Sequence, residues 1–237
     1  MNKRPMKRAE RLEICYDNER WKLLKDLRFK ALKIMETLNR YHIPSVVHGS
    51  IARGDVTENS DIDVFLPDLT SSFIIETALE RSGFTQYRRT IVQATPTYAL
   101  KANIELEQQS HLSFPLVKMR PVEKEFYRFG GEAFIITLIE DRRVPGVDKR
   151  LMLIEPTADG HIESSIIGRE EEASKILGVS LNTILDRVRA LLRRDKVGRT
   201  GIFIEKELDS DETFEQAIKK LADHNPAVRR RAKFFQN

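Results

Sequence analysis

The first long pattern of hydrophobic and polar positions is helical and covers residues 17–40. Its apolar residues recur at spacings of three and four, so they share one face of the predicted helix, while Lys and Arg fill the other faces. Pro44 then predicts a break, because a proline disfavours helix in the residue before it. Val46 and Val47 follow as the end of a buried strand. A long helix therefore leads into the first core strand.

Alternation with a period of two predicts two strands that carry acidic residues. In the first, Asp61 and Asp63 fall on the face opposite Ile62 and Val64. In the second, residues 97–107, one face is apolar and the other carries Lys101, Asn103, Glu105 and Glu107. The remaining patterns up to residue 154 predict helices over 71–81 and 122–129. They also predict strands over 84–93, 111–116, 135–139 and 151–154.

From Gly168 onward the pattern becomes helical. Residues 170–177 and 181–194 predict two helices joined by the three-residue turn Gly178–Ser180, with Ser180 as the N-cap of the second helix. This is the helix-turn-helix arrangement. Residues 193–204 resemble a short wing, and residues 211–222 form a last amphipathic helix that ends before Pro226. If the second helix binds nucleic acid, the residues expected to contact it are Asn182, Thr183, Arg187, Arg189, Arg193, Arg194 and Arg199.

Composition places the chain among globular proteins. It has 237 residues, which suits one large or two modest domains, and we expect a helical segment at 1–40, a main domain at 41–165 and a helix-turn-helix domain at 166–237. The mixture of helices and strands predicts an α+β fold with a mixed sheet. The single cysteine, Cys15, fits a reducing cytoplasmic compartment. No segment reads as a membrane span or a signal peptide. The net charge of +4 is concentrated in basic clusters, which suit contact with DNA or RNA or describe a charge-dense surface.

The most informative stretch runs from His48 to Asp63. Gly49 and Ser50 follow the buried strand and start a short helical segment that stops at Gly54. A strand that leads into a helix start presents backbone N–H groups, which favour phosphate, and Ser50 adds a hydroxyl donor. Two residues apart on the next strand, Asp61 and Asp63 repel one another unless a cation lies between them. Mg²⁺ is bound in this way, by one or two carboxylates together with substrate phosphates.

This stretch resembles the polymerase-β-type nucleotidyltransferase superfamily, whose signature is Gly-Ser, a helix and then an Asp-x-Asp strand at about this spacing. The residues that match are Gly49, Ser50, Ala52, Arg53, Gly54, Ser60, Asp61 and Asp63. Within the superfamily, the chain looks most like small archaeal predicted nucleotidyltransferases with a C-terminal helix-turn-helix domain. The resemblance implies that Asp61 and Asp63 bind Mg²⁺ or Mn²⁺ and that Gly49, Ser50 and Arg53 hold the phosphates of an NTP. A third carboxylate on a neighbouring strand would be Glu105 or Glu107, and the open strand end slightly favours Glu107.

The resemblance implies transfer of a nucleoside monophosphate from an NTP to a hydroxyl acceptor, with release of pyrophosphate. The sequence does not identify the acceptor. Two other functions are compatible with the same residues. One is a nucleic-acid-binding regulator whose transferase-like domain only senses nucleotide or is degenerate, which the Glu in place of the family's usual Asp would favour. The other is a toxin–antitoxin-type interaction module.

Overall fold

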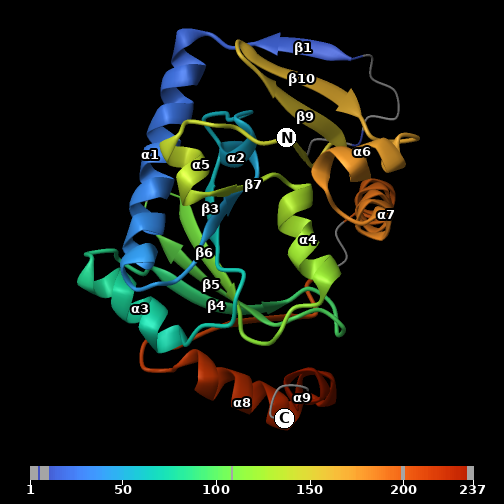
Figure 1. Ribbon diagram of the computed structural model, residues 1–237. Helices are drawn as coiled ribbons and strands as arrows, with labels where there is room; N and C mark the ends of the chain where they lie inside the picture. The colour runs from blue at the N-terminus through green and yellow to red at the C-terminus, as the bar shows by residue number, and fades with distance from the viewer. Residues whose placement is uncertain (1–4, 6–10, 108, 199–200, 234–237) are drawn as a thin grey trace. The chain divides into compact units, whose positions relative to one another are not determined.

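The computed structural model describes residues 5, 11–107, 109–198 and 201–233 (Figure 1). Two compact units divide the chain, and each is assembled from three separate stretches. The first unit consists of Met1–Leu32, Val47–Ser60 and Lys124–Thr200. The second consists of Lys33–Val46, Asp61–Glu123 and Gly201–Asn237. Neither unit is a continuous segment, because the chain passes between the units several times.

The first unit contains a four-stranded antiparallel sheet in the order β1-β10-β9-β8. Its strands are β1 (Leu12–Cys15), β8 (Gly146–Val147), β9 (Met152–Thr157) and β10 (Gly160–Ser165). The helix pair α6 (Glu170–Leu177) and α7 (Leu181–Val197) shares one apolar cluster with β9, which includes Leu153, Leu177 and Ile184. The unit also contains α2 (Ser50–Arg53), β7 (Glu132–Phe134), α5 (Ile135–Ile139) and the larger parts of α1 (Asn18–Arg40), β2 (Val46–His48) and α4 (Pro121–Phe129).

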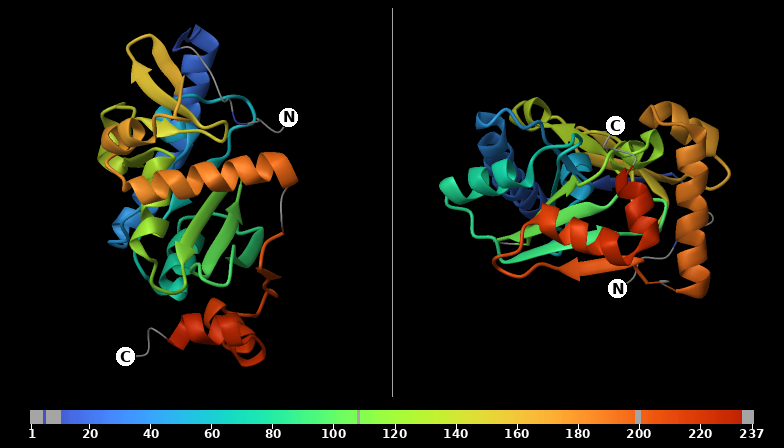
Figure 2. Two further views of the ribbon diagram at one scale, coloured as in Figure 1. Left: turned by 90° about the vertical axis from the view of Figure 1, so that its right-hand side faces the viewer. Right: turned by 90° about the horizontal axis from the view of Figure 1, so that it is seen from below.

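The second unit is built on a mixed sheet in which β11, β4, β5, β6 and β3 are successive neighbours. The pairs along this order are antiparallel except that β3 (Ile62–Phe65) runs parallel to β6 (Ser110–Pro115). The other strands are β4 (Arg88–Gln93), β5 (Lys101–Leu106) and β11 (Ile204–Glu207), and the helices are α3 (Ser72–Arg81), α8 (Phe214–His224) and α9 (Pro226–Lys233). Figure 2 shows α8 and α9 beside the strands of this sheet.

The sheet of the second unit has one apolar and one polar face. Val64, Leu112 and Ile104 are paired across β3, β6 and β5, and all three are fully buried. On the same face, Phe114 meets Phe214 of α8 edge to face, with ring centroids 5.4 Å apart. The alternation expected along β5 is confirmed, since Ala102, Ile104 and Leu106 are buried while the intervening residues are more exposed. The polar side chains therefore gather on the opposite face.

Several elements differ from the predictions. The apolar run at 135–139 is the helix α5 rather than a strand, because periodicity cannot distinguish short buried strands from helices. The sequence does not predict β1, which has four mostly exposed residues, or β10, which is buried along almost its whole length, because neither alternates between buried and exposed positions. The helix expected at 211–222 ends before Pro226, since α8 ends at His224, but it is not the last helix. Pro226 begins α9, which is possible because the first turn of a helix needs no N–H from its first residue.

The predicted wing is wrong. Ile204–Glu207 forms β11, which pairs with β4 in the sheet of the second unit, so it is not an appendage of α7. Arg199, expected to contact nucleic acid, lies outside the described residues. No helix in the described part of the chain has the length and apolarity needed to cross a bilayer.

Candidate active site

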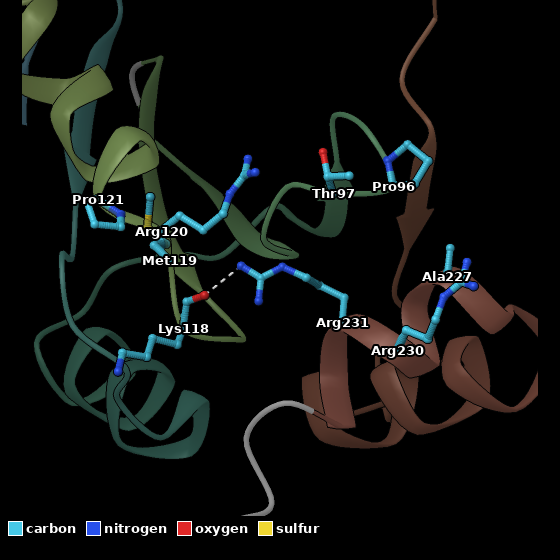
Figure 3. A pocket seen from close by; sticks show the side chains of 9 residues that line it. All are labelled: Pro96, Thr97, Lys118, Met119, Arg120, Pro121, Ala227, Arg230 and Arg231. Atoms are coloured by element: carbon cyan, nitrogen blue, oxygen red, sulfur yellow. Dashed lines mark hydrogen bonds between the residues drawn. The ribbon is translucent and has the colours of Figure 1, made fainter. Parts of the chain in front are cut away.

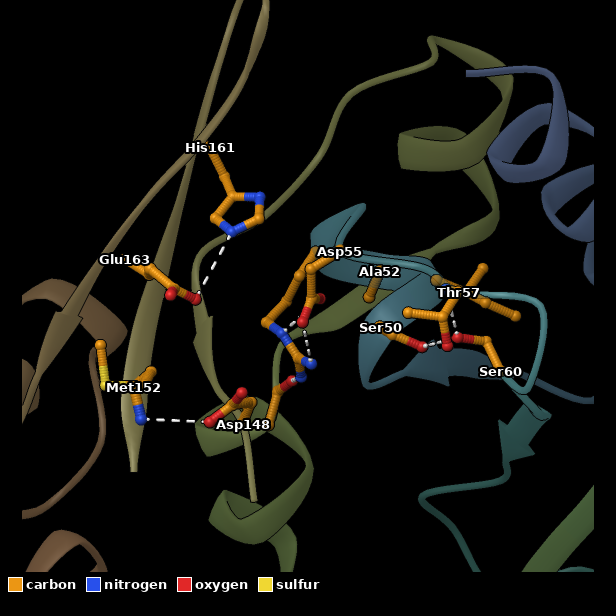
Figure 4. A network of polar contacts seen from close by, with 12 residues as sticks. Ser50, Ala52, Asp55, Thr57, Ser60, Asp148, Met152, His161 and Glu163 are labelled. Carbon is orange, nitrogen blue, oxygen red and sulfur yellow. Dashed lines mark hydrogen bonds and ion pairs between the residues drawn. The ribbon is translucent and has the colours of Figure 1, made fainter. Parts of the chain in front are cut away.

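Gly49 and Ser50 join β2 to the four-residue helix α2 in the first unit. Gly49 has φ 81° and ψ −145°, a conformation that a residue with a Cβ rarely adopts. Its N–H donates to the carbonyl of Gly131 over 3.0 Å, so this hydrogen bond stabilises the fold. The hydroxyl of Ser50 donates to that of Ser60 over 3.2 Å, and Ser60 Oγ accepts from the Thr57 N–H (Figure 4). The loop leading to the acidic strand is thereby held to the start of α2.

Arg53 has a structural environment that differs from the expected phosphate contact. Its side chain is 7% exposed and forms two parallel hydrogen bonds to Asp55, Nε to Oδ1 over 2.9 Å and Nη2 to Oδ2 over 3.0 Å. Its Nη1 donates to the carbonyl of Gly130 over 2.5 Å. Nε and both Nη atoms of Arg53 thus each donate a hydrogen bond within the first unit, and these bonds fix the loop after α2.

His48 lies beside this turn, and its ring packs edge to face on Tyr127 of α4, with centroids 4.9 Å apart. His48 therefore has a packing role at the end of β2. A second histidine, His161 of β10, lies in a buried polar network that no sequence pattern indicated (Figure 4). The Tyr16 hydroxyl is 2.6 Å from His161 Nδ1, and burial raises the pKa of Tyr16 to about 12. Glu163 is shared between His161 and Arg150, which also pairs with Asp148.

The acidic strand β3 lies in the second unit. Asp61 directly precedes β3 and is exposed, whereas Asp63 is half-buried on the polar face of the sheet. The register places Asp63 opposite His111 of β6, and His111 opposite Glu105 of β5. Because residues that pair across neighbouring strands lie on the same face, these three residues form one row. Asn103 and Ser113 are paired on the same face one step along the strands.

The register separates the two candidates for a third carboxylate. Glu105 lies within β5 and in the row of Asp63, while Glu107 follows the end of β5 and lies in the turn to β6. Adjacent strands are about 4.8 Å apart, so two strand spacings place the backbones of Asp63 and Glu105 about 10 Å apart. His111 occupies the position between them. The immediate neighbour of β3 therefore presents a histidine in the row where a carboxylate was expected.

The described residues contain no group of three or more His, Cys, Asp or Glu side chains close enough to hold a metal ion. Asp61 and Asp63 nevertheless match the usual Mg²⁺ site in nucleotide enzymes, which supplies one or two carboxylates and completes its shell with substrate phosphates and water. Their exposed and half-exposed positions on a polar surface leave both carboxylates accessible to such an ion. The donor set thus fits a metal that arrives together with a nucleotide.

The C-terminal helix pair of the first unit has the expected turn, with Gly178 in the left-handed conformation and Ser180 as N-cap. Asn182, Arg189, Arg193 and Arg194 are exposed, as a contact surface requires. Thr183 is buried, with 1% of its surface exposed, and its hydroxyl donates to Glu125 of α4 over 2.5 Å. The guanidinium of Arg187 lies 4.6 Å from the centre of the Phe126 ring. Thr183 and Arg187 therefore attach α7 to α4, and the expectation that they project outward is corrected.

Comparison with known proteins now adds to this geometry. Residues 29–114 match the family model of the nucleotidyltransferase domain, a range that includes Gly49, Ser50, Asp61, Asp63 and Glu105. The matched segment is less than half of the chain, and it supports the superfamily that the sequence resembles. No curated protein matches the chain.

Two solved structures are similar to parts of the chain. One is a cytoplasmic RNA terminal U-transferase, 23% identical, with 43% of this chain and 30% of that chain covered and a TM-score of 0.31. The other is a CCA-adding enzyme in complex with ATP, 16% identical, with 93% and 51% covered and a TM-score of 0.31. The chain therefore spans about a third to a half of the length of these two proteins. At this level of similarity, neither structure adds to what the domain match supports.

Proposed function

We propose that this protein transfers a nucleoside monophosphate from an NTP to a hydroxyl acceptor in a reaction that depends on a divalent metal. The observation that carries the proposal is the polar face of the second unit's sheet. There, Asp63 follows the exposed Asp61 at the start of β3, inside the segment that matches the nucleotidyltransferase domain. Substrate phosphates would supply the ligands that the two carboxylates leave open on the metal.

In the proposed reaction, the hydroxyl oxygen of the acceptor forms a bond to the α-phosphorus of the NTP, and the hydroxyl proton passes to water. The bond from that phosphorus to the bridging oxygen breaks, and pyrophosphate leaves with the bonding electron pair. A bound Mg²⁺ would supply neutralisation of phosphate charge and polarisation of the attacking oxygen. Asp61 and Asp63 would hold the ion by their carboxylates. Gly49 and Ser50 are proposed to bind the phosphates of the NTP, on the strength of their place in the matched motif.

We propose that Glu105, rather than Glu107, is the third carboxylate. Glu105 faces the same side of the sheet as Asp63 and shares its row, whereas Glu107 belongs to a turn. A Glu carboxylate extends further from the backbone than an Asp carboxylate. This extra length suits a residue that must reach past His111 toward the acidic strand.

The experiment is to incubate the purified protein with each NTP, Mg²⁺ and either RNA, DNA or small hydroxyl acceptors, and to measure pyrophosphate release and labelled product. Asp61→Asn and Asp63→Asn are each expected to lower the rate by roughly a hundredfold or more. The matched control is Glu80→Gln, which removes an exposed charge from α3 in the same unit. Equal rates in the aspartate variants and the control would contradict the proposal.

The exposed face of α7 suggests a nucleic-acid acceptor or effector as part of the same proposal. Arg189, Arg193 and Arg194 are exposed along this helix, and Arg189 Nη1 lies 4.0 Å from Asp186, an exposed pair that leaves it accessible. Phosphate contacts by such residues make binding dependent on salt. Arg193→Ala should therefore lower affinity for an oligonucleotide and reduce the slope of log affinity against log salt by about one. An unchanged slope would exclude α7 from the contact surface.

A further inference from the structure

A cavity of about 710 Å³ lies within the second unit, apart from the row of Asp63 (Figure 3). Three segments line it: the β4–β5 connection, the β6–α4 connection and helix α9. Its volume falls within the range of about 300–1,000 Å³ that is typical of small-molecule sites. The lining residues are Pro96, Thr97, Lys118, Met119, Arg120, Pro121, Ala227, Arg230 and Arg231.

The charged residues that line the cavity are all basic. Four of the nine lining residues are cationic and none is acidic. Two of the cations share the carboxylate of Glu123, which is 4% exposed. It accepts hydrogen bonds from Arg120 Nε over 3.0 Å and from Arg231 Nη2 over 3.5 Å. One buried carboxylate thus orients two guanidinium groups, while the described residues include no ion pair of Lys118 or Arg230. A cavity with this excess of positive charge attracts anions.

The cations differ in how firmly they are held. Arg231 also donates to the carbonyl of Lys118 over 2.7 Å, which ties α9 to the β6–α4 connection (Figure 3). The guanidinium of Arg120 lies 4.9 Å from the centre of the Tyr98 ring. Lys118 and Arg230 are exposed, and no acidic residue in the described part of the chain pairs with either of them. Two cations therefore shape the cavity, and two are available to a ligand.

The uncharged wall identifies the class of anion. Met119, Pro96 and Pro121 line the cavity together with its cations, so a ligand meets apolar surface as well as charge. Inorganic phosphate has no group to place against that surface, and it would fill only a small part of the volume. A nucleotide has a planar base and a ribose in addition to its phosphate. We propose that this cavity is a second ligand site that binds a nucleotide unit, with its phosphate at Arg230.

The site is separate from the proposed metal site. Apart from those of α9, the residues that line it either follow Pro115 of β6 or precede Lys101 of β5, and these two residues pair at one end of the β5–β6 hairpin. His111, which shares the row of Asp63, pairs with Glu105 four residues back along β6. Four residues of strand correspond to about 13 Å. Binding here consequently does not require Asp61 or Asp63 and survives if the proposed reaction is wrong.

The test measures binding of ATP, of a short single-stranded oligonucleotide and of inorganic pyrophosphate to the full chain in EDTA. Arg230→Glu should weaken nucleotide binding by roughly tenfold or more, because it replaces a charged donor by a repelling carboxylate. Thr97→Trp should weaken it by filling the cavity without a change of charge. Lys219→Glu, an exposed lysine of α8 away from the cavity lining, makes the same charge change as the matched control.

Loss of ATP or oligonucleotide binding in Arg230→Glu and Thr97→Trp, with retention in Lys219→Glu, is the expected result. ATP binding identifies a free nucleotide as the ligand, and binding of the oligonucleotide alone identifies a nucleic-acid strand. The proposal is overturned if neither probe binds in EDTA, if pyrophosphate binds as tightly as ATP and the oligonucleotide, or if the three variants behave alike. Repeating the titration with Asp63→Asn should leave the affinity unchanged.

Discussion

The buried pair of Arg53 and Asp55 gives the sharpest test of how the loop after α2 is held. We consider Arg53→Met, which keeps most of the side-chain volume but removes the guanidinium. The exposed fractions of the two side chains are 7% and 11%, so the variant leaves the Asp55 carboxylate largely buried without its partner. It also removes the donor to the Gly130 carbonyl.

Removing one member of a buried, hydrogen-bonded ion pair typically costs about 3–5 kcal/mol. With a urea dependence of about 1–3 kcal/mol per molar, this loss corresponds to a midpoint shift on the order of 1 M or more. Urea unfolding followed by tryptophan fluorescence measures it, because the single tryptophan, Trp21, belongs to the first unit. The double variant Arg53→Met/Asp55→Leu should recover much of the loss, since no unpaired charge is left in the buried site.

The result that would refute this reasoning is a small midpoint shift, equivalent to less than about 1 kcal/mol, together with loss of NTP binding. That combination would mean that Arg53 contacts phosphate, as the sequence motif alone suggests. A double variant that is as unstable as Arg53→Met would also contradict the argument, because it would locate the cost in packing rather than in the unpaired carboxylate.

Three further predictions follow from other contacts. Glu105→Gln should lower metal-dependent turnover by at least about tenfold, whereas the turnover of Glu107→Gln should stay near that of the unmodified protein. The opposite order would contradict the choice of Glu105 from the β5–β6 register. Burial lowers the pKa of His161 below its ordinary 6.5, so the folded state binds a proton less readily than the unfolded state. The free energy of unfolding should therefore fall as the pH drops below about 6.5, and His161→Gln should flatten that dependence in pH-resolved urea titrations. Glu125→Ala removes the acceptor for the Ser180 N–H and hydroxyl and for Thr183, so it should cost about 1–3 kcal/mol and speed amide exchange at the start of α7; unchanged exchange would contradict the anchoring role.

The sequence predicted the parts of the structure that depend on local chemistry. Alternation placed Asp63 and Glu105 on the polar side of their strands, and the turn residues Gly178 and Ser180 located the helix pair correctly. These features follow from backbone geometry over a few residues, which short-range patterns encode directly.

The rest depends on long-range pairing, which no short window contains. Nothing near residues 204–207 indicates that this strand pairs with β4, more than a hundred residues earlier. The burial of Thr183 and Arg53 depends in the same way on partners from distant segments, Glu125 and Gly130. The choice between Glu105 and Glu107 required the β5–β6 register, since alternation alone places both on one face.

The most direct measurement is calorimetric titration of each NTP into the full chain, with and without Mg²⁺, for the unmodified protein and for Asp63→Asn. The metal-dependent part of the heat should appear with at least one NTP and disappear in Asp63→Asn, while the thermal unfolding midpoint stays within a few degrees. The same metal-dependent heat in both proteins would show that Asp63 does not hold the ion, and nucleotidyl transfer at this site would have to be abandoned.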